Sequence, residues 1–254
     1  MTKRLLGLLI FLLMAGVGCN VPTEGEPEPL ECVTDGMRAS VDEDYGDTRR
    51  VSKFTFPANN PNEAYVIRPT DHYKGPANPN FFLIEYGDFQ CPGCAAFAQM
   101  NGQIIAEYPE HFGIIYRHFP LNQIHQHAHK MAEASEAAAS QGRFWAYHDA
   151  LYACQGQFKD LSNREAGRLM VDIAADLGLD AEQFEQELSS GQHTTFVDAL
   201  TLEAANMGLN GTSAGLVHFA GTPNAEVLPG LPVALDPWVQ LIGGELMRRG
   251  VTLE

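Results

Sequence analysis

The chain has few positive charges for its size. Among its 254 residues, Lys and Arg number 16 and Asp and Glu number 32, so the formal net charge at pH 7 is −16. Nucleic acid and anionic membrane surfaces attract basic proteins, so this balance argues against both as partners. Hydrophobic residues still make up 45% of the chain, which is enough for a globular protein with a sizeable core.

The apolar run near the N-terminus is too short for a typical membrane-spanning helix. Lys3 and Arg4 precede this run at residues 5–17, which is the pattern of a signal peptide, expected here over residues 1–18. The small residues before Cys19 resemble the lipobox of bacterial lipoproteins, although Gly16 stands where that family usually has Leu. The resemblance implies lipidation of Cys19, and Asn20 in place of Asp implies sorting to the outer membrane, facing the periplasm, in a Gram-negative source. The alternative is an ordinary cleaved signal in which Cys19 is incidental.

Export matters for the cysteines, because disulfides persist outside the cytoplasm. Four cysteines follow Cys19, at positions 32, 91, 94 and 154. If Cys91 pairs with Cys94, then Cys32 and Cys154 remain as a possible structural disulfide. Two free thiols are the alternative, since the sequence does not give their separation in space.

The chain has a single Cys-x-x-Cys motif, Cys91-Pro92-Gly93-Cys94. Structural zinc sites usually combine such a motif with a second pair of Cys or His at similar spacing, and that second pair is missing. An inert structural disulfide is a second alternative, but a turn between a strand and a helix is a poor place for one. Redox chemistry is therefore the favoured interpretation.

The sequence around this motif predicts a strand, a turn and a helix. Residues 81–84 form an apolar run typical of a central strand that is covered on both faces. Gly87 and Asp88 interrupt the run, and Pro92 suits the first position of a helix, where its fixed φ helps and its missing N–H costs nothing. Cys91 is therefore expected at or near the N-cap of the helix.

This placement predicts the roles of the two thiols. A thiolate at a helix N-terminus faces unpaired backbone N–H groups and the positive end of the helix dipole, so its pKa should fall. Cys91 is thus the expected nucleophile. Cys94, one helical turn further on, is the expected resolving thiol, since the spacing lets the two sulfurs form a tight disulfide.

The remaining elements follow from local patterns. Pro and Glu make residues 20–31 a flexible tether, which belongs to an N-terminal extension over residues 19–62. We expect a short strand at 64–67, a turn at 74–80, a helix from the motif to about 108, and a strand at 113–119. A block of helices should follow from about 125 to 207, with caps at 162–163 and 180. Strands are expected at 216–219 and 225–228, and Asp236-Pro237 should open a C-terminal helix that ends near 249.

This order of elements, with the segments IEYGDFQCPGCAAF, RHFPLNQIHQHAHK and QGRFWAYHDALY, resembles the DsbA-like thiol:disulfide oxidoreductases over roughly residues 64–250. The resemblance implies an α/β, thioredoxin-like fold with an inserted α-helical domain. The thioredoxin-like domain would comprise residues 63–121 and 208–254, and the insertion residues 122–207. The family implies exchange of disulfides with cysteines of exported proteins. We expect no cofactor and no bound metal.

The resemblance also implies two further parts of the site. Glu85 matches the acidic residue that many members bury beneath the active site, where a raised pKa would let it exchange a proton with Cys94. A strand Glu that reaches solvent is the alternative. Family members place a cis-proline loop opposite the cysteines, and here the aligned loop carries Thr212 and Ser213, with serine replacing the proline. The peptide bond before Ser213 is then either cis or trans. A Gly-Thr-Pro run at 221–223 is expected to be a hairpin turn.

Three histidines, His125, His127 and His129, stand at the start of the helical block. If the helix already includes position 125, His125 and His129 share one face and could bind a metal ion. Solvated histidines at a helix start are the favoured interpretation.

The main hypothesis is a lipid-anchored, extracytoplasmic thiol:disulfide oxidoreductase with a membrane redox partner. The oxidase direction is favoured, because a stabilised Cys91 thiolate makes the disulfide form oxidising. A metal-binding or chaperone-like protein, in which the loss of the proline weakens exchange, is the alternative. A reductase supplied by a membrane electron donor is a third possibility that differs only in potential and partner.

Overall fold

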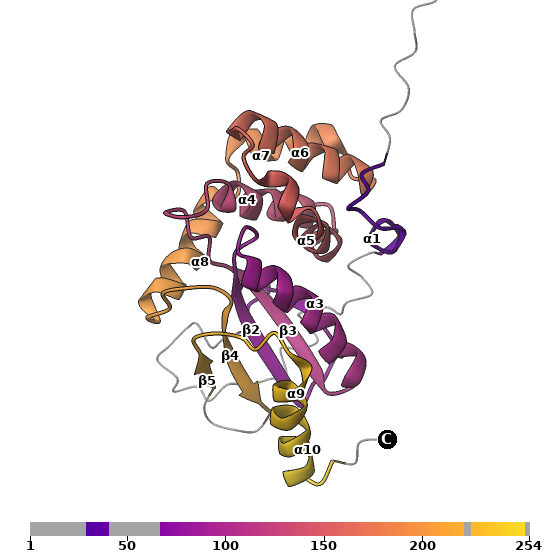
Figure 1. Ribbon diagram of the computed structural model, residues 1–254, viewed down its shortest axis with the longest axis vertical. Helices are drawn as coiled ribbons and strands as arrows, with labels where there is room; N and C mark the ends of the chain where they lie inside the picture. Colours follow the sequence, from indigo (N-terminus) through magenta and orange to yellow (C-terminus); the bar gives the residue numbers. More distant parts are fainter. Residues whose placement is uncertain (1–28, 41–66, 221–224, 252–254) are drawn as a thin grey trace, which may run out of the picture.

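The computed structural model describes residues 29–40, 67–220 and 225–251 (Figure 1). The expected signal peptide, Cys19, much of the expected tether and extension, and the expected turn at 221–223 lie outside these residues. None of the helices in the described part combines the length and the apolar character that crossing a membrane requires.

A five-stranded mixed sheet forms the centre of the molecule, with the strand order β1-β3-β2-β4-β5. The strands are β1 (His72–Lys74), β2 (Phe81–Gly87), β3 (Phe112–His118), β4 (Ala214–Phe219) and β5 (Glu226–Leu228). The pair β2 and β3 is parallel and the other pairs are antiparallel. Every residue of β2 is buried, because this strand has a neighbour on both sides and apolar layers on both faces. The prediction of a central strand here is confirmed.

The first strand differs from the prediction. Ile67 lies outside any strand and residues 64–66 are not described, whereas β1 begins at His72 and ends at Lys74 and overlaps the turn expected at 74–80 only at Lys74. Three residues are too few to show an alternating pattern in the sequence. The strand is fixed instead by Tyr73, whose hydroxyl donates to the carbonyl of Pro76 at 2.5 Å. The Tyr73 side chain lies against Gly113, where an added Cβ would meet its hydroxyl oxygen at 2.3 Å and its ring at 2.6 Å.

The helices fall into two groups (Figure 1). One group gathers beyond one end of the sheet and comprises α4 (Ala128–Ala139), α5 (Phe144–Ala153), the 3₁₀ helix η3 (Gln155–Phe158), α6 (Asn163–Asp176) and α7 (Ala181–Ser190). The next helix, α8 (Thr194–Asn206), leads from this group back to the sheet, where Ala204 packs against β2. The other helices pack beside the sheet and comprise α3 (Pro92–Glu107), α9 (Leu235–Trp238), η4 (Val239–Gly243) and α10 (Gly244–Arg248).

Capping explains where two of these helices begin. The Ser162 hydroxyl accepts from the backbone N–H of Glu165, whose carboxylate accepts from the backbone N–H of Ser162 in return. The Asp180 carboxylate accepts from the backbone N–H groups of Glu182 and Gln183. Both caps were predicted from the sequence.

The C-terminal helix was predicted incorrectly in two respects. Ala234, not Asp236, is the N-cap, so Pro237 lies within the first turn, and a π-helical turn at η4 interrupts the helix before α10. Trp238 explains the earlier start. Its ring is buried against Phe81 and Phe97, and its indole N–H donates to the carbonyl of Pro232 at 2.8 Å.

The alternation along β2 separates two apolar cores. Phe82, Ile84 and Tyr86 face a small core that includes Ala204 of α8. Phe81 and Leu83 face the larger core, which extends through α3 to the helical group and to α9 and α10. Since side chains alternate along a strand, Glu85 points to the same face as Phe81 and Leu83, toward α3.

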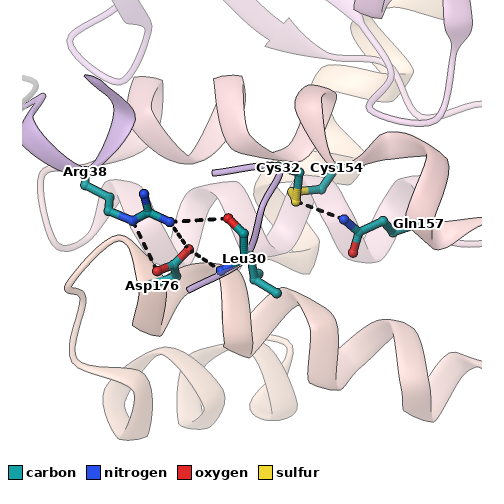
Figure 2. Close-up of a disulfide and its surroundings, with 6 residues drawn as sticks. All are labelled: Leu30, Cys32, Arg38, Cys154, Gln157 and Asp176. Carbon is teal, nitrogen blue, oxygen red and sulfur yellow. Dashed lines mark hydrogen bonds and ion pairs between the residues drawn. A yellow bond between two sulfur atoms is a disulfide. The ribbon is translucent and has the colours of Figure 1, made fainter. Parts of the chain in front are cut away.

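The described N-terminal segment docks on the helical group (Figure 2). It contains the short helix α1 (Asp35–Ala39), and Cys32 forms a disulfide with Cys154 across a Cα–Cα distance of 5.2 Å. The Asp176 carboxylate accepts from the backbone N–H of Leu30 at 3.0 Å and from the Arg38 guanidinium at 2.9 Å. Of the two alternatives for Cys32 and Cys154, the structure contains the bridge.

Candidate active site

The Cys91-Pro92-Gly93-Cys94 motif lies where β2 ends and α3 begins. Cys91 is the N-cap residue of α3, with φ −76° and ψ 121°, and Pro92 occupies the first helical position. Cys91 is 8% exposed and Cys94 is fully buried, and both are free thiols. The outer and inner positions of the two sulfurs therefore follow from the helix geometry.

The surroundings of Cys91 favour its thiolate. A hydrogen bond from the Cys94 thiol is the largest cause, and the backbone N–H groups of Cys94 and Gly93 add to it. Together they lower the pKa of Cys91 to about 5, although burial of the sulfur opposes the shift. Cys91 is therefore a thiolate at neutral pH.

Cys94 and Glu85 behave in the opposite way. Burial raises the pKa of the Cys94 thiol well above its usual range, and its hydrogen bond to Cys91 adds to the effect. Burial also raises the pKa of the Glu85 carboxyl, with a further contribution from the nearby Cys91 thiolate. Glu85 is 1% exposed, and its Oε1 has no hydrogen-bond partner among the described residues. Glu85 is thus buried rather than solvent-facing, and it favours its protonated form.

The loop before β4 lies opposite the motif. The peptide bond between Thr212 and Ser213 is cis. Cys91 Sγ lies 3.3 Å from the carbonyl oxygen of Thr212, and the Ser213 carbonyl accepts from the backbone N–H of Leu231 at 2.9 Å. The structure therefore places Thr212 and Ser213 beside Cys91, as the resemblance implied.

Asp88 organises the turn before the motif, and the sequence reasoning missed it. Its side chain is fully buried, and Oδ1 accepts from the backbone N–H of Gln90 at 2.7 Å. Oδ2 accepts from the backbone N–H of Leu121 at 2.8 Å and from Nδ1 of His125 at 2.7 Å. Asp88 thus ties the turn to the segment that follows β3. Its place directly before the motif was the only available signal.

Two tyrosines lie beneath the site and were also missed. The hydroxyl groups of Tyr116 and Tyr152 are 3.1 Å apart, and Tyr152 lies within 3.4 Å of the carbonyl of Asp88. Tyr116 approaches β2 so closely that a Cβ at Gly87 would meet its ring at 2.5 Å. Burial raises the pKa of both phenols, so they remain neutral around the thiols.

The histidine prediction was wrong in its geometry. Helix α4 begins only at Ala128, so His125 precedes the helix and shares no helical face with His129. His127 is buried and bonds through Nε2 to the carbonyl of Leu161 at 3.0 Å, so it is not solvated. His125 is the one that reaches the site, through Asp88.

One group of side chains in the described part of the chain could hold a metal ion. Nε2 of His72 and Nε2 of His118 each lie 2.7 Å from Oε1 of Glu136, and the three atoms lie within 4.8 Å of one another. Nδ1 of His118 is buried without a partner among the described residues. If a metal ion bound Nε2 of His118, the ring proton would lie on Nδ1, where it would be a buried donor without an acceptor. Two imidazoles that donate to one carboxylate oxygen therefore fit these residues better.

Cys91 and Cys94 have no comparable ligand set among the residues that the structure describes. In the described ranges, no third Cys, His or carboxylate forms a metal-binding group with Cys91 and Cys94. The metal-binding alternative thus gains no support from their surroundings.

A protein-family model described as thioredoxin matches residues 68–214, more than half of the chain. This chain belongs to that thioredoxin family. The match begins shortly before β1 and ends at the start of β4, so it includes the motif, the helical group and the loop at 212–213. The α/β, thioredoxin-like prediction is confirmed.

Solved structures place this thioredoxin-family chain among DsbA-like folds. The structure of α-DsbA1 from Wolbachia pipientis has a TM-score of 0.64 and 21% sequence identity, covering 76% of this chain and 99% of that one. BdbD from Bacillus subtilis has a TM-score of 0.57 at 16% identity, covering 69% and 92%. A thioredoxin-like oxidoreductase from Silicibacter pomeroyi has a TM-score of 0.56 at 23% identity, covering 75% and 99%. The predicted DsbA-like fold is thereby confirmed.

The curated relatives are much longer proteins. A Na(+)/H(+) antiporter NhaA 1 from Salinispora arenicola is 34% identical over 119 residues, which cover 47% of this chain and 17% of the relative. A protein of the same name from Mycolicibacterium gilvum is 36% identical over 161 residues, which cover 60% of this chain and 25% of the relative. The matches thus span a quarter or less of these relatives.

Proposed function

We propose that this chain is an extracytoplasmic thiol:disulfide oxidoreductase that exchanges disulfides with the cysteines of exported proteins. One observation carries the proposal. Two thiols in one motif have oppositely shifted pKa values, with an ionised Cys91 at the helix N-terminus and a protonated Cys94 beneath it. Such a pair separates the attacking sulfur from the resolving sulfur.

The oxidase direction follows from the stability of the Cys91 thiolate. A substrate thiolate attacks Cys91 in the Cys91–Cys94 disulfide, which forms a mixed disulfide and releases Cys94. A second substrate thiolate then attacks the substrate sulfur of the mixed disulfide, and Cys91 leaves as a thiolate. The substrate loses two electrons and the enzyme disulfide gains them, so a low pKa for Cys91 favours the forward reaction.

Glu85 supplies the proton that this cycle needs. Cys94 leaves as a thiolate in a buried place where its pKa is raised, so it takes up a proton. The raised pKa of Glu85 keeps a proton on the carboxyl for this transfer. Thr212 and Ser213 stand opposite Cys91, where a substrate chain reaching the sulfur would pass.

The location and partners belong to the same proposal. We expect residues 1–18 to direct export and lipidated Cys19 to hold the chain on the periplasmic side of a membrane, which sorting in a Gram-negative source would make the outer membrane. A membrane redox partner would restore the Cys91–Cys94 disulfide. The N-terminal extension, residues 19–62, would link the anchor to the thioredoxin-like part, and the insertion at 122–207 would cover the motif.

A redox titration tests the proposal. The oxidised chain is mixed with a reduced two-cysteine peptide, and peptide oxidation is followed in glutathione buffers of known potential. We expect stoichiometric oxidation by the wild-type chain and none by Cys91→Ser. Exchange that persists in Cys91→Ser would contradict the assignment, and a strongly reducing potential would reverse the direction.

A further inference from the structure

Gln155 reaches from the helical group into the active-site turn. Its side-chain Nε2 donates to the backbone carbonyl of Phe89 at 2.8 Å and to that of Cys91 at 3.0 Å. Gln155 is the first residue of η3 and lies 64 residues after Cys91 in the chain. One amide group therefore holds two carbonyls, one on each side of Gln90.

The two carbonyls belong to the turn that presents Cys91. The other side is already fixed, because the backbone N–H of Cys91 donates to the carbonyl of Asp88 at 3.0 Å. The Cys91 carbonyl also accepts from the backbone N–H of Ala95 at 3.1 Å, as the first bond of α3. The Gln155 amide, which donates to the Cys91 carbonyl, adds a further bond that fixes the Cys91 backbone. The position of that backbone directs the sulfur toward the N–H groups of Gly93 and Cys94.

Gln155 is itself held by the disulfide in Figure 2. The preceding residue, Cys154, is fully buried and is bonded to Cys32. The Cys154 carbonyl accepts from the backbone N–H of Gln157 at 2.8 Å, which closes the first turn of η3. Cys32 belongs to the segment that Asp176 fixes through Leu30 and Arg38. The base of the Gln155 side chain thus cannot move freely.

We propose that Gln155 is a positioning residue for Cys91: its amide bonds to the Phe89 and Cys91 carbonyls fix the turn in the geometry that stabilises the Cys91 thiolate. The inference deepens the proposed exchange activity and rests on it for its purpose. What it predicts is the pKa of one thiol, that of Cys91. Gln155 touches no reacting atom and acts through the backbone of Cys91.

A thiolate titration of the reduced protein tests this role. Gln155→Met keeps the length of the side chain but removes both donors, and the absorbance of the thiolate near 240 nm is followed against pH. We expect the Cys91 pKa to rise by about half a unit or more, the scale of one ordinary hydrogen bond. The matched control is Gln157→Met, in the same short helix, whose amide bonds to Cys32 Sγ at 3.1 Å and not to the turn. We expect no shift there.

Three outcomes would overturn the inference: an unchanged Cys91 pKa in Gln155→Met, equal shifts in both variants, or a downward shift. If Gln155→Met does not fold, the wild-type protein gives the answer by NMR. The side-chain amide protons of Gln155 should shift with the titration of Cys91, because they bond to its own carbonyl, and an insensitive signal would refute the role. Neither measurement uses a substrate, so a failure of the proposed exchange activity would be seen separately in the peptide oxidation.

Discussion

At the scale of single residues, the site separates two identical thiols by one helical turn. Cys91 takes the N-cap of α3 and Cys94 the buried position behind it, so the same chemical group meets backbone donors in one place and apolar burial in the other. The pKa of Cys91 falls to about 5 while that of Cys94 rises. Position alone thus gives one side-chain type two opposite pKa shifts, as the proposed exchange reaction needs.

The stability of the reduced protein should therefore depend on pH. Because the pKa of Cys91 is about 5 when folded and roughly 8.5 when unfolded, its contribution is fully present above the unfolded value and is lost as pH falls through the folded value. Between these values, the free energy of unfolding of the reduced form should rise relative to the oxidised form by about 1.4 kcal/mol per pH unit. Urea unfolding of both forms across this range measures the difference. A pH-independent difference would contradict the assigned thiolate.

Glu85 gives a second prediction at this scale. Glu85→Gln keeps the size of the side chain but cannot donate an acidic proton to Cys94. We expect oxidation of the peptide to slow by at least about tenfold at neutral pH, because general acid help is lost. Stopped-flow mixing measures the rate. A rate equal to that of the wild type across the pH range would assign Glu85 to packing alone.

At the scale of elements, a buried ion-pair network joins the sheet to α8. Arg117 of β3 is fully buried and donates to Asp71 at 2.8 Å, to Glu203 of α8 at 3.0 Å and to the hydroxyl of Tyr86 at 3.1 Å. Arg68 also pairs with Glu203. The network includes the Tyr86 hydroxyl of β2 and links β3 to α8, where the helical group returns to the sheet.

Removing Arg117 should be costly. Arg117→Met leaves the Asp71 carboxylate buried without its main partner, so we expect the free energy of unfolding to fall by about 3–5 kcal/mol. Arg248→Met is the control, because Arg248 pairs with Glu245 at an exposed site, where such pairs contribute about 0–1 kcal/mol. Chemical denaturation measures both. Equal losses would mean that the buried pairing has no special weight.

The sequence predicted the elements that local chemistry determines. Pro92 after Cys91 predicted the helix start, and Ser162 and Asp180 predicted two further helix caps. It could not predict contacts between distant residues, such as Asp88 with Leu121 or Gln155 with Cys91, because no local pattern encodes them. The start of the C-terminal helix was predicted wrongly for the same reason, since the tertiary packing of the buried Trp238 determines where the helix begins.

At the scale of the whole molecule, the Cys32–Cys154 disulfide closes a loop over a sequence separation of 122 residues. A cross-link over such a distance restricts the unfolded chain strongly. We expect the double variant Cys32→Ser/Cys154→Ser to lose roughly 2–5 kcal/mol of stability. Because Cys154 holds Gln155, the Cys91 pKa should also rise in this variant. Thermal unfolding and thiolate titration measure the two effects, and a stable variant with an unaltered Cys91 would contradict both.

The order of the cysteines along the chain has a consequence for biogenesis. Cys91 and Cys94 lie within the loop that Cys32 and Cys154 close, so the reactive pair is nested inside the structural one. Because a chain is synthesised from its N-terminus, Cys91 and Cys94 become available to Cys32 before Cys154 does. The four cysteines after Cys19 allow three complete pairings, and only one of them includes the Cys32–Cys154 bond of the structure. Any early disulfide of Cys32 with Cys91 or Cys94 must therefore be exchanged before the Cys32–Cys154 disulfide can form.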